Sequence, residues 1–211
     1  MCDAKGFLKG REWMRAAEEF LQEASGNNGD LLSLLREAVG LVSYYRRLLE
    51  RFELDALTGL PGSNKFRDFT AGLDSRAAGV GVVFFDVNDL KFYNDTKGHQ
   101  AGDLLLQKAS ESILHIAGEN AHAFRVGGDE FVMVITGCAE SDMDTLLAKW
   151  REKLAELNSV ADGIHCSIAA GWAYSSGEDT FSDILKQADE RMYAEKKRMK
   201  SAKPPKLRGT R

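Results

Sequence analysis

The run GVGVVFFD, residues 79–86, restricts the fold of this chain more than any other stretch. It is apolar without interruption until its last residue, Asp86. A strand of this composition has both faces buried, unlike the alternating strands of a sheet that faces water on one side. We therefore expect it to lie inside a sheet, with the remaining elements arranged around it.

The segments on either side of this strand alternate between helical and extended patterns. We expect helices at about 64–75, 101–117, 141–158 and 181–200, a strand at 164–174, and a hairpin of two short strands around the glycines of RVGGDEF. Strand, helix, hairpin, helix and strand give the βαββαβ order of a ferredoxin-like sheet with helices on one face. The predicted fold class is α/β, of the α+β kind.

A helical segment precedes this domain. Residues 11–25 have the pattern of a short amphipathic helix, and a longer helix is expected from about 30 to 54, before the turn LTGLPG. The longer helix carries an apolar seam in heptad spacing, formed by Leu31, Ala38, Tyr45 and Phe52 at one position and Leu34, Leu41 and Leu48 at the other. This seam packs either on its own domain or against a second copy. We favour dimerisation, because a helix this apolar has to bury its stripe.

These boundaries give three parts: a signalling or dimerisation segment at 1–54, a main domain at 55–200 and a basic tail at 201–211. The first part is too short for an ordinary ligand-sensing domain. We therefore expect an upstream sensor domain or a partner protein to act through it.

Composition excludes several classes of protein. With 211 residues, 44% of them hydrophobic, the chain can form one sizeable core. A net charge of -4 gives no argument for nucleic acid, and the basic stretch 186–211 is interpreted as a solvated helix face and tail. No apolar run approaches the roughly 20 residues of a membrane span, and a signal peptide is not evident. Cysteines without a CxxC pair favour reduced thiols and a cytoplasmic location.

RVGGDEFVMV, residues 125–134, places two glycines and two carboxylates at the tip of the expected hairpin. Asp86 ends the central strand, where an acid usually caps a turn or helix, but Asn88 is expected to cap the next helix instead. The first strand and the hairpin are neighbours in a ferredoxin-like sheet, so Asp86 and Asp129 can face each other. Two close carboxylates need a cation, and Mg²⁺ takes such oxygen ligands together with phosphate. The glycines leave room for that phosphate.

RVGGDEF resembles the signature of the GGDEF-domain diguanylate cyclases, and three further stretches resemble that family in the same order. They are DALTGLPG at 55–62, FFDVNDLKFYNDTKGHQAGD at 84–103 and ADERMYAEKKRMK at 188–200. The resemblance covers about 55–200. It implies a nucleotide-cyclase domain of palm type that condenses two GTP molecules into cyclic di-GMP and releases two pyrophosphates.

The resemblance also implies how this reaction proceeds. The 3′-hydroxyl of one GTP attacks the α-phosphate of the other, with Mg²⁺ as cofactor, two ions per site and Mn²⁺ as the alternative metal. Each domain binds one GTP, so the active unit is a homodimer.

Individual residues match positions of known role in that family. Asp86, the backbone carbonyl of Val87 and Asp129 match the metal ligands. Asp129 also matches the acceptor of the proton from the attacking hydroxyl, and Glu130 matches a residue that assists a second metal. Lys91 matches a lysine near the reacting phosphate.

Other positions match substrate contacts: Asn94, His99 and Asp103, the phosphate-side glycines Gly127 and Gly128, and the outer-phosphate cations Lys196 and Lys200. Asn94 and Asp103 match readers of the guanine edge, and an acceptor-only carboxylate suits the N–H donors of guanine. Lys196 and Lys200 stand four residues apart and so share one helical face. His99 as a plain polar contact and the lysine pair as an ordinary helix end remain alternatives. Arg125 is interpreted as a strand residue that braces the motif acids.

Two other functions remain open. One is a degenerate domain that binds GTP or cyclic di-GMP without turnover, and the other is a nucleotidyltransferase that makes a mixed or linear dinucleotide. Many members of the family also carry an inhibitory product site, an RxxD tetrad that begins nine residues before the first motif glycine. Here that tetrad is Gly118-Glu119-Asn120-Ala121, which contains neither residue. We therefore expect little allosteric inhibition by product.

Overall fold

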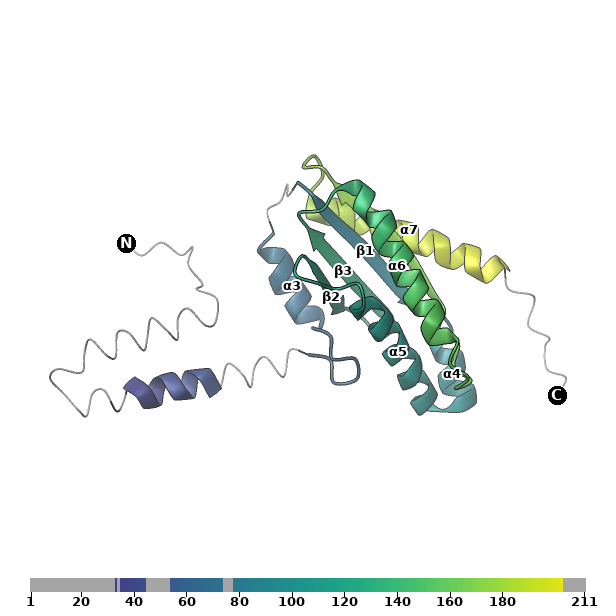
Figure 1. Ribbon diagram of the computed structural model, residues 1–211, viewed down its shortest axis with the longest axis horizontal. Helices are drawn as coiled ribbons and strands as arrows, with labels where there is room; N and C mark the ends of the chain where they lie inside the picture. The colour runs from purple at the N-terminus through teal and green to yellow at the C-terminus, as the bar shows by residue number, and fades with distance from the viewer. Residues whose placement is uncertain (1–32, 34, 45–53, 74–77, 203–211) are drawn as a thin grey trace. The chain divides into compact units, whose positions relative to one another are not determined.

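The computed structural model describes residues 33, 35–44, 54–73 and 78–202 (Figure 1). The chain divides into two units, Met1–Phe52 and Glu53–Arg211. In the first unit, residues 35–44 are helical, as expected for the long N-terminal helix, and Leu41 and Val42 are exposed. The helix expected at 11–25 and most of the apolar seam lie outside the described residues.

The second unit contains a four-stranded antiparallel sheet in the order β2-β3-β1-β4. The strands are β1 (Val80–Val87), β2 (Ala121–Arg125), β3 (Glu130–Thr136) and β4 (Ile168–Ser175). The helices are α3 (Ser63–Ala71), α4 (Leu90–Lys97), α5 (His99–Leu114), α6 (Glu140–Asn158) and α7 (Phe181–Ala202). This is the ferredoxin-like order expected from the sequence, with the apolar run as a central strand.

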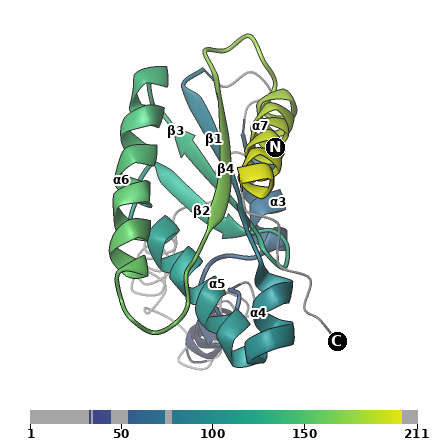
Figure 2. The same cartoon turned by 90° about the vertical axis from the view of Figure 1, so that its right-hand side faces the viewer.

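Helices cover both faces of the sheet, so the expectation of helices on one face was wrong. Val83, Phe85 and Val87 of β1 pack under α5 and α6, whereas Val80 and Val82 pack on the side of α3 and α7. Figure 2 shows α6 on one side of the strands and α7 with α3 on the other. A strand that is apolar on both faces requires this arrangement, because each face exposed to water would lose the free energy of burial.

Under α6, an aromatic pair fixes the helix on the sheet. The rings of Phe85 and Trp150 meet edge to face with their centroids 5.0 Å apart, and neither side chain is more than 3% exposed. Such a pair adds about 1 kcal/mol beyond simple burial. The indole Nε1 of Trp150 donates to Ser112 Oγ on α5 at 3.1 Å, which satisfies the one polar group that the ring would otherwise bury unpaired.

On the opposite face, α7 approaches β4 closely because Gly171 has no side chain. A Cβ atom at this position would clash with the backbone of Ala188 and Met192 in α7. The side chains of Ile184, Ala188 and Met192 recur at intervals of four residues and are buried. The helical period therefore directs one stripe of α7 onto the sheet. Residues that continue this stripe at the same spacing lie toward the end of the helix.

Several segment ends differ from the sequence predictions: α3 ends at Ala71 and not at residue 75, and α5 spans His99–Leu114 and not 101–117. β4 begins at Ile168 and not at residue 164, because the backbone groups of 164–166 bond to side chains, among them those of Tyr93 and Lys108, instead of a strand. Leu54, expected to be the last helical residue of the N-terminal segment, forms a β-bridge with Pro61.

The described part of the chain contains no helix with the length and apolarity that a bilayer crossing requires. Of the cysteines within it, Cys138 and Cys166 are free thiols. Burial raises the pKa of Cys166 to about 12, so this thiol is held in its neutral form.

Candidate active site

Asp86 stands next to the end of β1 and is 4% exposed. Its Oδ2 atom accepts a hydrogen bond from Lys196 Nζ of α7 at 2.5 Å. Its Oδ1 atom is buried and has no hydrogen-bond partner among the described residues. Burial raises the pKa of Asp86, the Lys196 ammonium opposes this, and the charge of Asp129 adds to the rise.

The motif acids lie beside it, as the sequence predicts. Glu130 is the direct cross-strand neighbour of Asp86, and the backbone carbonyl of Asp129 accepts a hydrogen bond from Val87 N at 2.9 Å. Burial raises the pKa of Glu130, and the nearby charges of Asp129 and Asp86 raise it further. The Glu130 carboxylate folds over Gly127, where a Cβ atom would lie 2.6 Å from Oε2. A side chain at Gly127 would therefore displace the Glu130 carboxylate from this position.

The arrangement has the chemistry of a divalent cation site. Within the described ranges, no three His, Cys, Asp or Glu side chains gather closely enough to hold an ion by themselves. Mg²⁺ seldom needs such a set, since it takes one or two carboxylates and completes its shell with water and phosphate. A buried carboxylate oxygen without a partner, Asp86 Oδ1, is the group that such an ion would satisfy.

Helix α7 brings two lysines to this carboxylate. Lys196 bonds to Asp86 directly, and the charge of Lys200, one turn later, also lowers the pKa of Asp86. Both predicted phosphate-binding cations therefore lie at the same end of the sheet as the acids. The direct pair between Lys196 and Asp86 could not be read from the sequence, because the two residues are 110 positions apart.

The motif turn is braced by Arg125, the last residue of β2. Its NH1 group donates to Asp55 Oδ1 at 2.7 Å and its NH2 group to the Gly128 carbonyl at 2.6 Å. We had expected Arg125 to brace the motif acids. It braces the backbone of the turn instead. Thr58 donates to the same Asp55 oxygen through its backbone N at 2.9 Å and through Oγ1 at 2.6 Å.

Asp55 is a residue that sequence reasoning missed. Burial alone would raise the pKa of Asp55, but the hydrogen bonds from Thr58 and Arg125 outweigh it and hold the pKa below its ordinary value. The entry turn DALTGLPG is the only sequence signal for this role, since the partner residue lies 70 positions away.

The predicted guanine contacts lie on two helices joined at Gly98, whose φ of 84° favours glycine. Asn94 of α4 packs on Gly102 of α5, where a Cβ atom would lie 2.9 Å from its side-chain Cγ. Asp103 follows Gly102 in α5, so the structure brings Asn94 close to the helical turn that contains Asp103. Asp103 is exposed and makes no side-chain hydrogen bond to another described residue.

Lys91 and His99 are also exposed on these two helices. No hydrogen bond within the described part of the chain joins either side chain to the acids at the end of β1. Asn88, expected to cap α4, does not do so. The N-cap is Asp89, and the Asn88 amide donates instead to Ser167 Oγ at 3.3 Å and Met199 Sδ at 3.6 Å.

The position of an RxxD product site forms a tight turn before β2. Gly118 N donates to the Ala121 carbonyl at 3.0 Å, and Glu119 and Asn120 form the tip of the turn. The turn presents no guanidinium, and its one charged side chain is an acid that repels phosphate.

Comparison with known proteins extends these observations. The family model for "Diguanylate cyclase, GGDEF domain" matches residues 52–202. The chain is similar to Diguanylate cyclase DosC of Escherichia coli (strain K12), with 27% identity over 187 residues, 85% of this chain and 40% of DosC. It is also similar to Diguanylate cyclase DgcP of the same strain, with 29% identity over 199 residues, 89% of this chain and 57% of DgcP.

A third relative has a different activity in its name. Cyclic di-GMP phosphodiesterase PdeR of E. coli (strain K12) is 27% identical over 197 residues, 89% of this chain and 29% of PdeR. The chain thus spans about 40% of the length of DosC and less than a third of the length of PdeR.

Solved structures support the fold. The coiled coil and GGDEF domain of DgcB from Caulobacter crescentus, in complex with c-di-GMP, matches with a TM-score of 0.64 and 24% identity, over 79% of this chain and 94% of that one. Diguanylate cyclase SiaD from Pseudomonas aeruginosa, in complex with its activator SiaC, matches with a TM-score of 0.60 and 20% identity, over 89% and 78%.

Proposed function

Because the chain belongs to the GGDEF-domain family of diguanylate cyclases, we propose that it condenses two GTP molecules into cyclic di-GMP and two pyrophosphates. The observation that carries this proposal is the corner formed by Asp86, Asp129 and Glu130, with a buried, unpartnered carboxylate oxygen and two lysines beside it. A site that concentrates acids and cations at one point suits phosphate and metal better than it suits any apolar ligand.

The residues of the chain divide the work of this reaction. Asp86, the Val87 carbonyl, Asp129 and Glu130 would hold Mg²⁺ or Mn²⁺, two ions per site. The chemistry that these ions supply when bound is stabilisation of the charge that develops on the α-phosphate. Asp129 accepts the proton of the attacking 3′-hydroxyl.

The remaining site residues bind and orient GTP. Asn94 and Asp103 hold the guanine edge, with His99 nearby on α5. Lys91 lies on α4 toward the reacting phosphate, and Lys196 and Lys200 hold the outer phosphates as point charges. Gly127 and Gly128 keep the motif turn free of side chains where the phosphates approach. Lys196 neutralises Asp86 in the absence of substrate, so a negatively charged phosphate competes for it.

The active unit is a homodimer, because one domain binds one GTP and the reaction joins two. The N-terminal helical segment is the device that brings two domains together. The exposure of Leu41 and Val42 on the helix at 35–44 supports this. An isolated helix in water is marginally stable, and packing of its apolar residues against a partner would stabilise it. The same segment is the place where an activator or an upstream domain acts.

A second function is a domain that binds GTP or cyclic di-GMP without turnover. The similarity to PdeR, whose name describes a hydrolase, is the observation that favours it. Against it stands the complete set of site residues, from Asp86 through Asp129 to Lys196.

One experiment separates these functions. The full chain is incubated with Mg²⁺ and GTP, ATP or both, and the products are resolved by mass at several protein concentrations. Cyclic di-GMP from GTP alone, with a specific activity that rises with protein concentration, supports the dimeric cyclase. GTP binding without product supports the degenerate domain, and a mixed or linear dinucleotide supports the general nucleotidyltransferase. The Asp129→Asn variant is the control for contaminating activity.

A further inference from the structure

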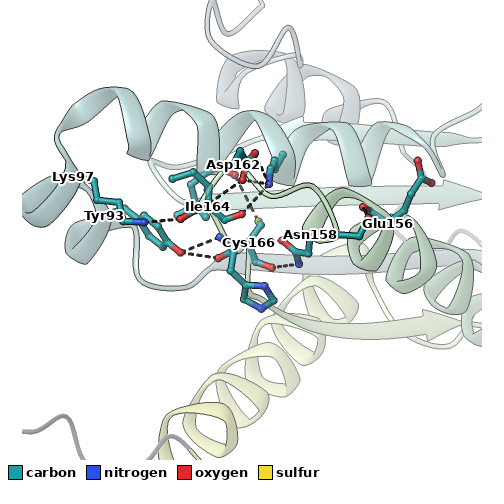
Figure 3. Close-up of polar contacts among 12 residues, drawn as sticks. Tyr93, Lys97, Glu156, Asn158, Asp162, Ile164 and Cys166 are labelled. Carbon is teal, nitrogen blue, oxygen red and sulfur yellow. Dashed lines mark hydrogen bonds and ion pairs between the residues drawn. The ribbon is translucent and has the colours of Figure 1, made fainter.

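Residues 159–167, which we call the connector, join α6 to β4 without forming a helix or a strand. Side chains of α4 hold the middle of the connector (Figure 3). The Tyr93 hydroxyl accepts a hydrogen bond from His165 N at 3.0 Å and donates one to the His165 carbonyl at 3.2 Å. Lys97 Nζ donates to the Gly163 carbonyl at 2.5 Å. Three backbone groups of the connector are thus satisfied by side chains of one short helix.

Helix α5 holds the same connector through Lys108. Its Nζ atom donates to the Ile164 carbonyl at 2.8 Å and forms an ion pair with Asp162 at 2.7 Å. Asp162 Oδ1 in turn accepts from Ile164 N at 2.9 Å. The Lys108 side chain is only 11% exposed, so this contact is shielded from water more than a surface ion pair is.

The other side of the connector is fixed to the end of α6 and to the core. Asn158 donates to the Cys166 carbonyl at 2.8 Å and accepts from Cys166 N at 2.7 Å (Figure 3). The side chains of Ile164 and Cys166 are buried. Residues 162–167 of the connector are therefore anchored to the domain by hydrogen bonds and burial, although they have no regular secondary structure.

This arrangement bridges a point where the chain could bend. Helix α4 ends at Lys97, α5 begins at His99, and a Cβ atom added to the Gly98 between them would meet no other atom within 4 Å. Tyr93 and Lys97 hold α4 to the connector, and Lys108 holds α5 to it. A third element thus contacts both helices, in addition to the direct packing of Asn94 on Gly102.

The predicted guanine contacts lie on the two sides of Gly98, Asn94 on α4 and Asp103 on α5. We propose that the connector fixes the spacing of Asn94 and Asp103, with Tyr93 and Lys108 as positioning residues for guanine recognition. This inference rests on the proposed function of Asn94 and Asp103. The connector also reaches the metal end of the site, because Asn88 N donates to the Ser167 carbonyl at 2.8 Å. It therefore holds the base-binding helices at a fixed position relative to β1.

The test uses Tyr93→Phe and Lys108→Met, with Thr96→Val as the matched control. Thr96 Oγ1 donates to the Phe92 carbonyl within α4 at 2.6 Å, so its loss removes a hydroxyl from the same helix without changing the connector. Values of kcat and KM are measured for GTP and for inosine triphosphate, which lacks the exocyclic amino group of guanine. All variants are assayed at a temperature at which circular dichroism shows each to be folded.

We expect Tyr93→Phe and Lys108→Met to raise the KM for GTP by about three- to tenfold, in keeping with the loss of one or two hydrogen bonds. The change in kcat is smaller, and the preference for GTP over inosine triphosphate falls. Thr96→Val behaves like the wild type. In the Asp103→Asn background, Tyr93→Phe has little further effect on this preference, because the contact that it positions is already lost.

Tyr93→Phe and Lys108→Met variants with lower melting temperatures but the nucleotide preference and KM of the wild type would overturn the inference. If Lys108→Met does not fold, Lys97→Met takes its place. A different result identifies failure of the proposed function: Asp103→Asn would then leave the nucleotide preference unchanged, and the inference would fall with it. If only the inference about the connector fails, Asp103→Asn still alters the nucleotide preference. Failure of the inference can therefore be distinguished from failure of the proposed function.

Discussion

Lys196 Nζ lies 2.5 Å from Oδ2 of Asp86, so the last helix of the domain neutralises the carboxylate at the end of the central strand. The pair is not a closed unit, because the second oxygen of Asp86 is buried without a partner. A buried pair that leaves one lone-pair site unsatisfied contributes little to stability. Its geometry suits a site that exchanges the lysine for a metal ion and a phosphate.

Asp86→Asn should lower activity by about 100-fold or more, the size of effect seen when one preorganised electrostatic contact is removed. The fold should persist, since the amide occupies the same volume. Mg²⁺ should raise the melting temperature of the wild type and leave that of the variant unchanged. Turnover near that of the wild type, or an unchanged response to Mg²⁺, would contradict the assignment of Asp86 as a metal ligand.

The same variant tests the pH dependence of stability in the metal-free protein. Burial raises the pKa of Asp86 above its ordinary value of 3.8, although Lys196 opposes the shift. The folded state therefore holds this proton more tightly than the unfolded state, and stability falls as the pH rises from about 4 through the folded pKa. Urea unfolding across this range should show a smaller fall for Asp86→Asn than for the wild type.

Lys196→Gln should raise the KM for GTP by about tenfold, because one charge-assisted contact to phosphate is worth roughly 1.5–3 kcal/mol and is partly screened here. Lys197→Gln is the matched control, since the neighbouring ammonium lies over the Tyr193 ring, 4.2 Å from its centroid, and not at Asp86. Steady-state kinetics with both variants decide the matter. Equal effects would mean that only the general charge of α7 attracts GTP.

Asp103→Asn should reduce the efficiency for GTP by about tenfold or more and weaken discrimination against ATP. An acceptor-only carboxylate becomes an amide that also donates, and a hydrogen bond to a charged group is worth roughly 1.5–3 kcal/mol. Asp95→Asn, an exposed substitution on α4, serves as the control. A variant that keeps the selectivity of the wild type would show that Asp103 does not bind guanine.

Asp55→Asn should destabilise the domain by about 1–2 kcal/mol at neutral pH, because Arg125 loses its charged partner and the motif turn its brace. The pKa of Asp55 lies below its ordinary value of 3.8, so its contribution is present above that value and is lost as the pH falls through the folded pKa. Urea unfolding should therefore separate variant and wild type at neutral pH and bring them together in strong acid. A constant difference at every pH would contradict the ionic role of Asp55.

Cyclic di-GMP should inhibit only by competition with GTP, because the turn at Gly118-Glu119-Asn120-Ala121 presents no arginine that can grip guanine and phosphate. Initial rates at several GTP concentrations and added product measure this. Inhibition that persists at saturating GTP would mean that product binds elsewhere on the protein.

Much of the fold could be predicted from the sequence, because the apolar run at 79–86 admits only a central strand. The neighbourhood of Asp86 and the motif acids followed from the same order of elements. The side of the sheet that α7 covers could not be predicted in this way. An amphipathic pattern shows which face of a helix is buried but not which surface covers that face. The predicted order of strands and helices was therefore confirmed, whereas the prediction that all helices lie on one face of the sheet was wrong.

The missed parts of the site share one physical cause. Arg125 with Asp55 and Lys196 with Asp86 are contacts between residues 70 and 110 positions apart, and no local sequence pattern reveals either pairing. Residues 164–167 of the connector were predicted as strand because they begin the β-prone run 164–174. Their backbone groups bond to side chains of Tyr93, Lys108 and Asn158 instead, and composition does not reveal such partners.

Gly171 of β4 sets the height at which Lys196 and Lys200 of α7 reach the carboxylates, although it contacts the helix at Ala188 and Met192 and not at either lysine. Any larger residue there would lift the helix from the sheet, because the obstacle is the backbone of Ala188 and Met192 and not a movable side chain. The affinity of the site for phosphate thus depends on a position that does not contact the nucleotide. A screen for altered substrate binding would find mutations at Gly171 although the residues that bind the substrate are unchanged.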